Sequence, residues 1–286
     1  MQELCTTACR FPAWSRALTR SHTEVVRSFD PLLEPFPLKA LTLRNRVVST
    51  SHEPAYAEDG MPKERYRLYH HEKAVGGVGL TMIGGSAVVA PDSPPSFGNL
   101  LLYKDEIVPW LRELTDDVHE AGAAVMCQVT HLGRRTSNFS GDWLPVVYAS
   151  PLREPAHRSF PKVAEPWDLD RIVDDYVAAA QRCVAAGLDG IELQSYGHFL
   201  DGFLSPATNR RDDELGGDLE ARTASPRRVV RAVRAAVGPD FVVGIRMSMD
   251  EDRADGVPIE GITRASVASL SIVPLMTLRK SMPSST

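Results

Sequence analysis

The sequence has no apolar run approaching the roughly 20 residues that cross a bilayer, so a membrane-spanning protein is not expected. It has only four cysteines among 286 residues, and only Cys5 and Cys9 lie close together. A disulfide framework or a structural zinc site is therefore not expected, and a reducing, cytoplasmic compartment is the default. The net charge of -5 gives no general case for nucleic acid or an anionic membrane as a partner.

The first 28 residues lack the apolar core of a secretory signal peptide. They carry four arginines against two glutamates, a composition that leaves a transit peptide open. The simpler interpretation is a disordered N-terminal extension over residues 1–28, or a start codon placed too far upstream.

A regular alternation of short apolar runs and helical stretches begins near residue 45. The runs are apolar along most of their length, as expected for strands covered on both faces, and the helical stretches have an apolar spacing near 3.6. The predicted strands are Arg46–Ser49, Gly79–Ile83, Ala124–Val129, Gly190–Leu193 and Phe241–Met247. The predicted helices are one that follows Lys63 and those over Ile107–Ala121, Leu169–Ala186 and Ser225–Val237.

The ends of the predicted helices carry residues that suit them. Asp168 is a good N-cap for the third helix, and Pro226 fits the first turn of the fourth. Gly122, Gly187 and Gly238 follow helices and suit the left-handed backbone conformation that often ends a helix.

Strand–helix alternation predicts an α/β fold with a parallel sheet. Two architectures compete. A doubly wound sheet usually has a glycine-rich turn after its first strand, and this chain has no G-x-G-x-x-G there. A (β/α)8 TIM barrel places functional residues at the carboxyl ends of many strands. Because such residues are found at several strand ends, the barrel is preferred.

The barrel is expected to be incomplete. The five predicted units take up about 41 residues each, so eight would need on the order of 330 residues, and only 36 residues follow position 250. No Asp or Glu occurs after Glu260, and no further strand–helix unit is legible there. We therefore expect about five of eight units over residues 29–262, followed by a divergent or out-of-frame tail over 263–286. A genuine short variant with a divergent end stays open.

Polar residues follow the predicted strands where a buried barrel strand should become loop. Converging polar groups at one barrel mouth are the default interpretation of an active site. These residues are Ser49–Glu53, Gly84–Ser86, Gln128, Thr130, His131, Gly133, Arg134, Arg135, Gln194–His198 and Arg246.

Four of these residues suit the isoalloxazine ring of a flavin. The ring needs a side-chain amide at its pyrimidine edge, which Gln128 could supply. It needs a cation near its N1–O2 edge to stabilise the reduced form, which Arg246 could supply. Gly84 and Gly85 would let the ring lie flat on the strand ends. A lone Gln at a strand end is more often a loop hydrogen bonder, whereas a lone Arg in an apolar strand is costly to bury unpaired.

A group that donates a proton or clamps the substrate must stand over such a ring, a role for Tyr196 or His198. His52 and His131 alone are more often structural. No carboxylate–histidine cluster has convincing metal spacing, so no metal site is predicted. The remaining histidines outside the first 28 residues are interpreted as surface residues: His70, His71, His119 and His157.

At these residues the chain resembles the old yellow enzyme family of FMN-dependent oxidoreductases, over about residues 30–262. The resemblance implies FMN as cofactor, with NAD(P)H as an electron donor left open, and it assigns FMN contacts to Thr50, Ser51, Gly85, Gln128 and Arg246. The motifs that carry it are Leu43–Val48, Gly76–Leu80, Gln128–Arg134, Phe203–Asp212, Gly216–Gly217 and Arg222.

Within that family, Ser49–Tyr56 looks closest to the branch of trimethylamine dehydrogenase and the demethylases of N-methylated amino acids. Several departures stand out. Glu53 replaces the cysteine that is joined covalently to flavin in trimethylamine dehydrogenase, so no covalent link is expected. Counting back from Phe203 places the family's His-x-x-His pair at Leu193 and Tyr196, with His198 taking over part of its role.

Two further departures lie towards the C-terminal end. The family's Tyr-Gly-Gly-Ser-x-x-Asn-Arg element is altered at three positions over Leu215–Arg222. The family's FMN phosphate site lies in the last two strand–loop units, and no residues here match it.

Three functions stay open at this point, with a small-molecule substrate and a homo-oligomer compatible with the first two. The first is oxidative demethylation of a small N-methylated amine or amino acid, with Tyr196 and His198 orienting the amine. The second is NAD(P)H-dependent reduction of activated alkenes, with Tyr196 as proton donor. The third is a non-catalytic truncated fragment, because an open strand arc exposes its edges.

Overall fold

The structure is a computed structural model that describes residues 30–93, 96–135, 145–156, 158–248, 250–258, 260–261 and 273–278. The fold described below is that of the unit Pro31–Thr286. The predicted extension over residues 1–28 lies outside the described residues, and so does the tail over 263–286, apart from Val273–Leu278.

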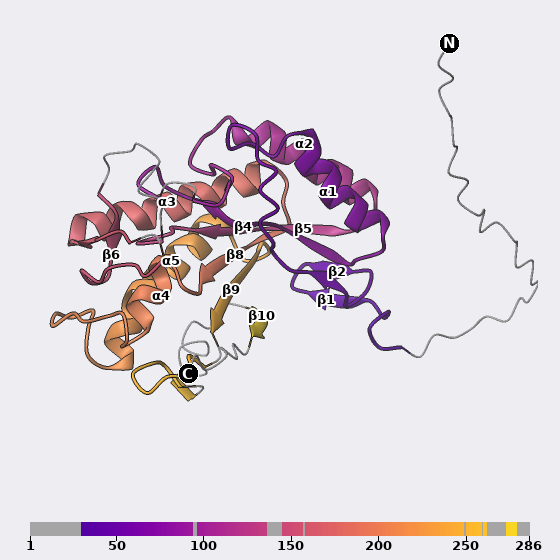
Figure 1. The fold of residues 1–286 in the computed structure, drawn as a ribbon. Coiled ribbons are helices and arrows are strands. Elements are labelled where there is room, and N and C mark those ends of the chain that lie inside the picture. The colour runs from indigo at the N-terminus through magenta and orange to yellow at the C-terminus, as the bar shows by residue number, and fades with distance from the viewer. Residues whose placement is uncertain are drawn as a thin grey trace, which may run out of the picture. The chain divides into compact units, whose positions relative to one another are not determined.

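A six-stranded parallel sheet forms the centre of this unit, and four long helices alternate with its strands (Figure 1). This alternation confirms the predicted α/β class and the partial barrel. In sheet order, the strands are β3 (Val48–Ser49), β4 (Leu80–Val88), β5 (Ala124–Thr130), β8 (Gly190–Ser195), β9 (Val242–Ser248) and β10 (Val273–Leu278). The helices are α1 (Glu64–Val75), α2 (Ile107–Glu120), α3 (Pro166–Ala185) and α5 (Leu219–Val237).

The smaller elements lie outside this sheet. β1 (Phe36–Leu38) and β2 (Leu41–Leu43) form an antiparallel pair that the sequence did not predict. β6 (Val147–Tyr148) and β7 (Lys162–Val163) form a short parallel pair, and α4 (Phe199–Leu204) follows β8 directly.

A sixth strand, β10, joins the five strands that the sequence predicted. It pairs in parallel with β9, with Val273 opposite Gly244 and Leu278 opposite Ser248. Pro274 explains why this strand was not predicted, since proline is depleted in strands and tolerated mainly at sheet edges. β10 is the outermost strand of the described sheet, which is such an edge.

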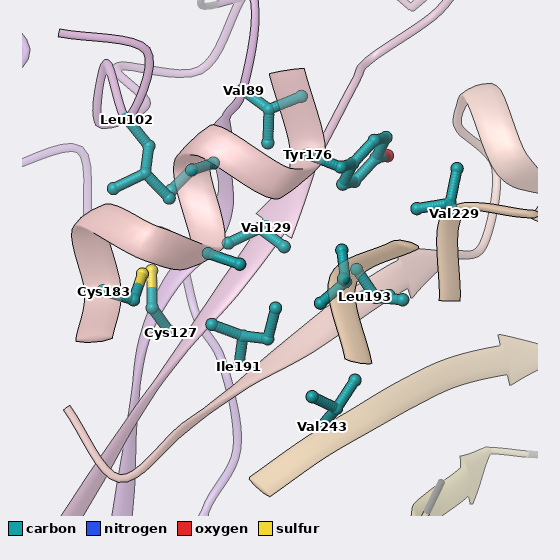
Figure 2. Packing of buried hydrophobic residues seen from close by; sticks show 14 of the residues in the cluster. Val89, Leu102, Cys127, Val129, Tyr176, Cys183, Ile191, Leu193, Val229 and Val243 are labelled. Carbon is teal, nitrogen blue, oxygen red and sulfur yellow. The ribbon is translucent and has the colours of Figure 1, made fainter. Parts of the chain in front are cut away.

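The alternation of side chains along each strand separates two apolar clusters. Ile83, Cys127 and Ile191 belong to the larger cluster, which the helices cover (Figure 2). The smaller cluster lies on the opposite face of the strands and includes Met82 and Met126. Its full membership, with the partners from the β1–β2 pair, is Leu38, Leu43, Leu80, Met82, Met126 and Val242.

Strand register stacks the residues of this second face in layers. Met82, Met126, Gly190 and Val242 stand side by side on successive strands. Gly190 has no room for a side chain, because a Cβ there would lie 2.5 Å from the Val242 carbonyl oxygen. The positions two residues further along each strand must therefore point to the same face, above this apolar layer.

Two helix starts differ from the prediction. Glu165 is the N-cap of α3, and Asp168 completes a capping box by accepting a hydrogen bond from the Glu165 N–H at 2.9 Å. α5 starts at Leu219 behind the N-cap Asp218, so Pro226 lies inside the helix and not in its first turn. The altered segment before α5 hid the true cap in the sequence.

The glycines predicted to end helices do so. Gly122, Gly187 and Gly238 have φ of 78°, 83° and 78°. His70, in contrast, was wrongly interpreted as a surface residue. It is fully buried, its Nδ1 lies 2.8 Å from Thr81 Oγ1, and burial followed by the charge of Lys73 lowers its pKa to about 3. Among the described helices, none combines the length and hydropathy needed to cross a bilayer.

Candidate active site

A cavity of about 460 Å³ opens where the strands β3, β4, β5, β8 and β9 end, within the size range usual for small-molecule sites. It is lined by residues from all five strand ends, as a barrel mouth requires. They are Ser51, His52, Glu53, Gly85, Phe97, Gln128, Arg135, Gln194, Tyr196, His198, Arg246, Met247 and Ser248.

The cavity brings together most of the residues that the sequence singled out. The predicted site residues on it are Ser51, Gly85, Gln128, Tyr196, His198 and Arg246. Thr50 is not among the lining residues, although its neighbours Ser51 and His52 are. Gly84 also stays off the cavity, where its N–H donates to Tyr66 Oη at 2.8 Å.

A buried carboxylate joins the two predicted flavin contacts on the cavity floor. Gln128 Nε2 donates to Glu192 Oε1 at 2.5 Å, and Arg246 Nε donates to the same oxygen at 2.9 Å. Glu192 is 1% exposed, and its burial raises its pKa although Arg246 and Gln128 act against that shift. We call these three side chains the floor triad.

The floor triad follows from strand register. Gln128 stands opposite Glu192, and Arg246 stands opposite Gln194, which lies two residues further along β8 on the same face. The diagonal from Glu192 to Arg246 is within reach of a long side chain. Glu192 was missed as a functional residue, and the available signal was a lone acid in the otherwise apolar run Gly190–Leu193.

The same register shows where the two positions expected for the family's histidine pair lie. Leu193 is fully buried in the cluster under the helices and faces away from the cavity. Gln194, the next residue, lines the cavity. Of the two positions given by counting back from Phe203, Leu193 therefore lies off the cavity, whereas Tyr196 lines it.

Several polar atoms at this site are buried and have no hydrogen-bond partner within the described part of the chain. They include Gln194 Oε1 and Arg246 Nη2, from neighbouring strands. Buried polar atoms are normally satisfied, so each such atom on a cavity wall favours a bound polar ligand.

His198 lies at the rim as the N-cap residue of α4. It is 6% exposed, and burial followed by the positive charge of Arg135 lowers its pKa to about 3, although a hydrogen bond with the Leu132 backbone acts the other way. His198 is therefore a neutral imidazole at physiological pH and a poor proton donor. Its Nδ1 is buried without a hydrogen-bond partner among the described residues, which suits an acceptor.

Glu53 is a second carboxyl group on the cavity. The sequence placed it at the barrel mouth but gave it no chemical role. Burial raises its pKa to about 7, while hydrogen bonds from the backbone of Ala55 and Gly85 act against the shift. The Ala55 N–H donates to its Oε1 at 2.9 Å, and its Oε2 has no hydrogen-bond partner among the described residues. Gly85 packs so closely here that a Cβ would lie 2.6 Å from Glu53 N.

Glu53→Gln is expected to change how stability depends on pH. The pKa of Glu53 rises from 4.5 to about 7 on folding, so the folded state keeps a proton that the unfolded state loses between these values. Stability therefore falls as pH rises through this window, by about 3 kcal/mol in total. Urea unfolding at pH 5 and pH 8 should show the variant gaining up to about 3 kcal/mol over the wild type at pH 8. Parallel pH profiles for the two proteins would contradict the assignment.

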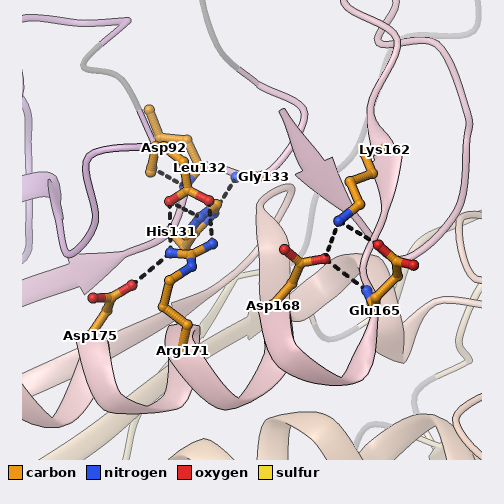
Figure 3. Close-up of polar contacts among 10 residues, drawn as sticks. Asp92, His131, Leu132, Gly133, Lys162, Glu165, Asp168, Arg171 and Asp175 are labelled. Atoms are coloured by element: carbon orange, nitrogen blue, oxygen red, sulfur yellow. Dashed lines mark hydrogen bonds and ion pairs between the residues drawn. The ribbon is translucent and has the colours of Figure 1, made fainter. Parts of the chain in front are cut away.

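A separate polar network holds the loop after β5 against α3 (Figure 3). His131 is fully buried and its Nε2 lies 3.1 Å from Asp92 Oδ1, while its Nδ1 accepts from the Gly133 N–H at 3.1 Å. Arg171 donates to both oxygens of Asp92, at 2.5 and 3.1 Å. Burial alone would raise the pKa of Asp92, but His131 and Arg171 lower it to about 2. His131 is thus a structural residue beside the cavity, not on its wall.

The partial barrel with a cavity at its strand ends is the architecture of a (β/α)-barrel enzyme, and comparison with known proteins gives the family. The chain belongs to the NADH:flavin oxidoreductase / NADH oxidase family, which matches residues 31–270. This confirms the resemblance inferred from the motifs.

Its curated relatives include a "Probable N-methylproline demethylase" of Rhizobium meliloti (strain 1021), 57% identical over 236 residues. That match covers 80% of this chain and 35% of the relative. A "Multifunctional alkene reductase/demethylase OYE" of Caballeronia cordobensis is 46% identical, over 78% of this chain and 33% of the relative. The chain therefore spans about a third of the length of these relatives.

Among solved structures, morphinone reductase in complex with tetrahydroNAD matches with a TM-score of 0.76 and 25% identity. The match covers 84% of this chain and 72% of that one. Histamine dehydrogenase from Rhizobium sp. 4-9 matches with a TM-score of 0.74 and 26% identity, over 82% of this chain and 35% of that one.

The cavity fits the flavin that the family implies. A flat ring with a polar pyrimidine edge needs an amide, a cation and a hydrogen-bond acceptor close together, and Gln128, Arg246 and Gln194 supply them. The unpartnered Arg246 Nη2 and Gln194 Oε1 are the kind of atoms that such an edge would satisfy. FMN is the cofactor of this family, and Gln128 and Arg246 are the residues that would hold its ring.

Proposed function

We propose that the protein is an FMN-dependent oxidoreductase that demethylates a small N-methylated amino acid or amine. The floor triad carries this proposal, because it presents an amide and a paired guanidinium to one cavity. Relatives named as an N-methylproline demethylase and an N,N-dimethylglycine/sarcosine dehydrogenase, at 57% and 43% identity, support the substrate class.

In this reaction a hydride leaves the methyl carbon, the resulting iminium takes up water, and the adduct releases formaldehyde and the demethylated amine. Bound FMN supplies the two-electron acceptor for the hydride. Arg246 would place a positive charge beside the bound ring, where it would favour the reduced form, and Glu192 keeps the guanidinium in place.

Three further cavity residues would bind the amine and accept its proton. An ammonium must lose its proton before a hydride can leave the neighbouring methyl group, and Glu53, with a pKa of about 7, is matched to accept it. His198 is neutral and can accept a hydrogen bond from the amine. Tyr196 and His198 would orient the substrate, since both line the cavity at the end of β8.

Formaldehyde release tests the proposal. The FMN-loaded protein is incubated with N-methylproline, sarcosine or dimethylglycine and an artificial electron acceptor, and formaldehyde is measured against amine product. We expect one formaldehyde for each methyl group removed. No formaldehyde from any N-methyl substrate, with the flavin bound, would rule the proposal out.

Reduction of activated alkenes is the second candidate. Tyr196 lies on the cavity wall, where a phenol could donate a proton to a substrate carbon, and the relative at 46% identity is named for both activities. Oxidation of NADPH by cyclohexenone would favour this candidate.

We also propose a reducing, cytoplasmic location. The two described cysteines, Cys127 and Cys183, are buried free thiols that lie close to each other (Figure 2). Neighbouring cysteines that form no disulfide suit such a compartment.

A further inference from the structure

Two arginines, Arg135 and Arg246, line the cavity, and they differ in whether a carboxylate pairs with the guanidinium. Arg246 is paired with the buried carboxylate of Glu192 at 2.9 Å. Arg135 has no carboxylate partner within the described part of the chain, and its Nε is buried without a hydrogen-bond partner there. Arg135 is half-buried and lines the cavity, and its one buried, open donor favours an anionic ligand, because an unpaired donor is costly to bury.

The fold fixes the backbone of Arg135 at the cavity wall. The Arg135 N–H donates to the Leu132 carbonyl at 3.1 Å, and Ser96 Oγ donates to the Arg135 carbonyl at 3.3 Å. Its guanidinium carbon lies 5.8 Å from the centroid of the Phe97 ring, which also lines the cavity. A residue whose backbone is fixed and whose side chain contacts a ring loses less freedom when it binds a ligand than a free surface arginine would.

The neighbouring residues leave the guanidinium accessible from the cavity. Gly197 lies alongside it, where a Cβ would stand 3.5 Å from Arg135 Nη1. The adjacent Arg134 is different, since its Nη1 donates to the carbonyls of Leu152 and Arg153 at 3.1 and 3.2 Å. Arg134 is also absent from the cavity wall, so one of the two consecutive arginines is structural and the other faces the site.

We propose that Arg135 binds the carboxylate of the substrate and thereby restricts the enzyme to N-methylated amino acids over simple N-methylamines. The planar fork of an arginine matches the two oxygens of a carboxylate, and such charge-assisted pairs are among the stronger hydrogen bonds. This inference rests on the proposed demethylation, and it names the substrate class of the same cavity.

Kinetics of Arg135→Gln with two matched substrates test the assignment. N-methylproline carries a carboxylate, and N-methylprolinamide has the same shape without the charge. We expect the variant to raise KM for N-methylproline by about 10- to 100-fold with little change in kcat, and to leave KM for the amide nearly unchanged. Arg135→Lys should recover part of the loss, because it restores the charge without the fork. Arg231→Gln, an exposed arginine on α5, is the control and should behave as wild type.

Binding of L-proline provides a readout that does not depend on turnover. The FMN-loaded protein is titrated with L-proline by calorimetry, and we expect wild type to bind it and Arg135→Gln to bind it at least 10-fold more weakly. Wild type that binds no L-proline, or a variant that binds it equally well, would overturn the inference. So would an equal loss for acid and amide substrates, which would indicate a purely structural role. Absence of formaldehyde from every substrate would instead refute demethylation. The L-proline titration would still test whether Arg135 binds a carboxylate.

Discussion

Arg246→Met is expected to lower the free energy of unfolding by about 3–5 kcal/mol, measured by urea denaturation of the flavin-free protein. Glu192 is 1% exposed, and Arg246 is the cation that pairs with it. Removing the guanidinium leaves a buried carboxylate whose remaining hydrogen-bond partner is the neutral amide of Gln128. The loss should shrink as the pH falls, because burial raises the pKa of Glu192 and a protonated Glu192 needs no counter-charge.

A second substitution separates the loss of charge pairing from the loss of packing. Glu192→Gln combined with Arg246→Met removes the stranded charge and should restore at least half of the lost stability. Arg246→Lys keeps a cation and should cost less than Arg246→Met. If the double variant were no more stable than Arg246→Met, the charge pair would not be the source of the effect.

Gln128→Leu is expected to weaken FMN binding by about 10- to 100-fold. The leucine has a similar size but offers no hydrogen bond to the ring edge, and it removes a donor from Glu192. Quenching of flavin fluorescence on titration with FMN measures the change.

The matched control is Gln181→Leu, which makes the same replacement at an exposed position of α3. This variant should bind FMN as the wild type does. Equal FMN affinity in Gln128→Leu and wild type would mean that the ring does not contact Gln128.

Short apolar runs that alternate with helical stretches were sufficient to predict the five strands that build the cavity. Each predicted strand overlaps an observed one, and Gln128 and Arg246 reach the same site as expected. This works because parallel strands place their carboxyl ends on one edge, so chemistry at those ends must converge.

The partners of these residues could not be predicted in the same way. Glu192 is recognisable as functional only when strand register shows that it faces Gln128 and reaches Arg246. Leu193 was assigned by counting along the chain, which does not show on which face of the strand its side chain lies. The raised pKa of Glu53 depends on burial by a loop whose path the sequence pattern does not encode.

β10 and the β1–β2 pair were missed for a different reason. Each is short and contains or adjoins proline. Each is a strand because it pairs with a neighbouring strand, and its own sequence pattern does not predict one. Such elements are determined by tertiary pairing, which the propensities of the local sequence do not show.

A crystal structure of the protein with FMN tests the central claim most directly. We predict that the isoalloxazine ring occupies the cavity at the strand ends, with its pyrimidine edge within hydrogen-bonding distance of Gln128 and Arg246. Flavin bound at another surface, or a cavity that stays empty at saturating FMN, would contradict the account.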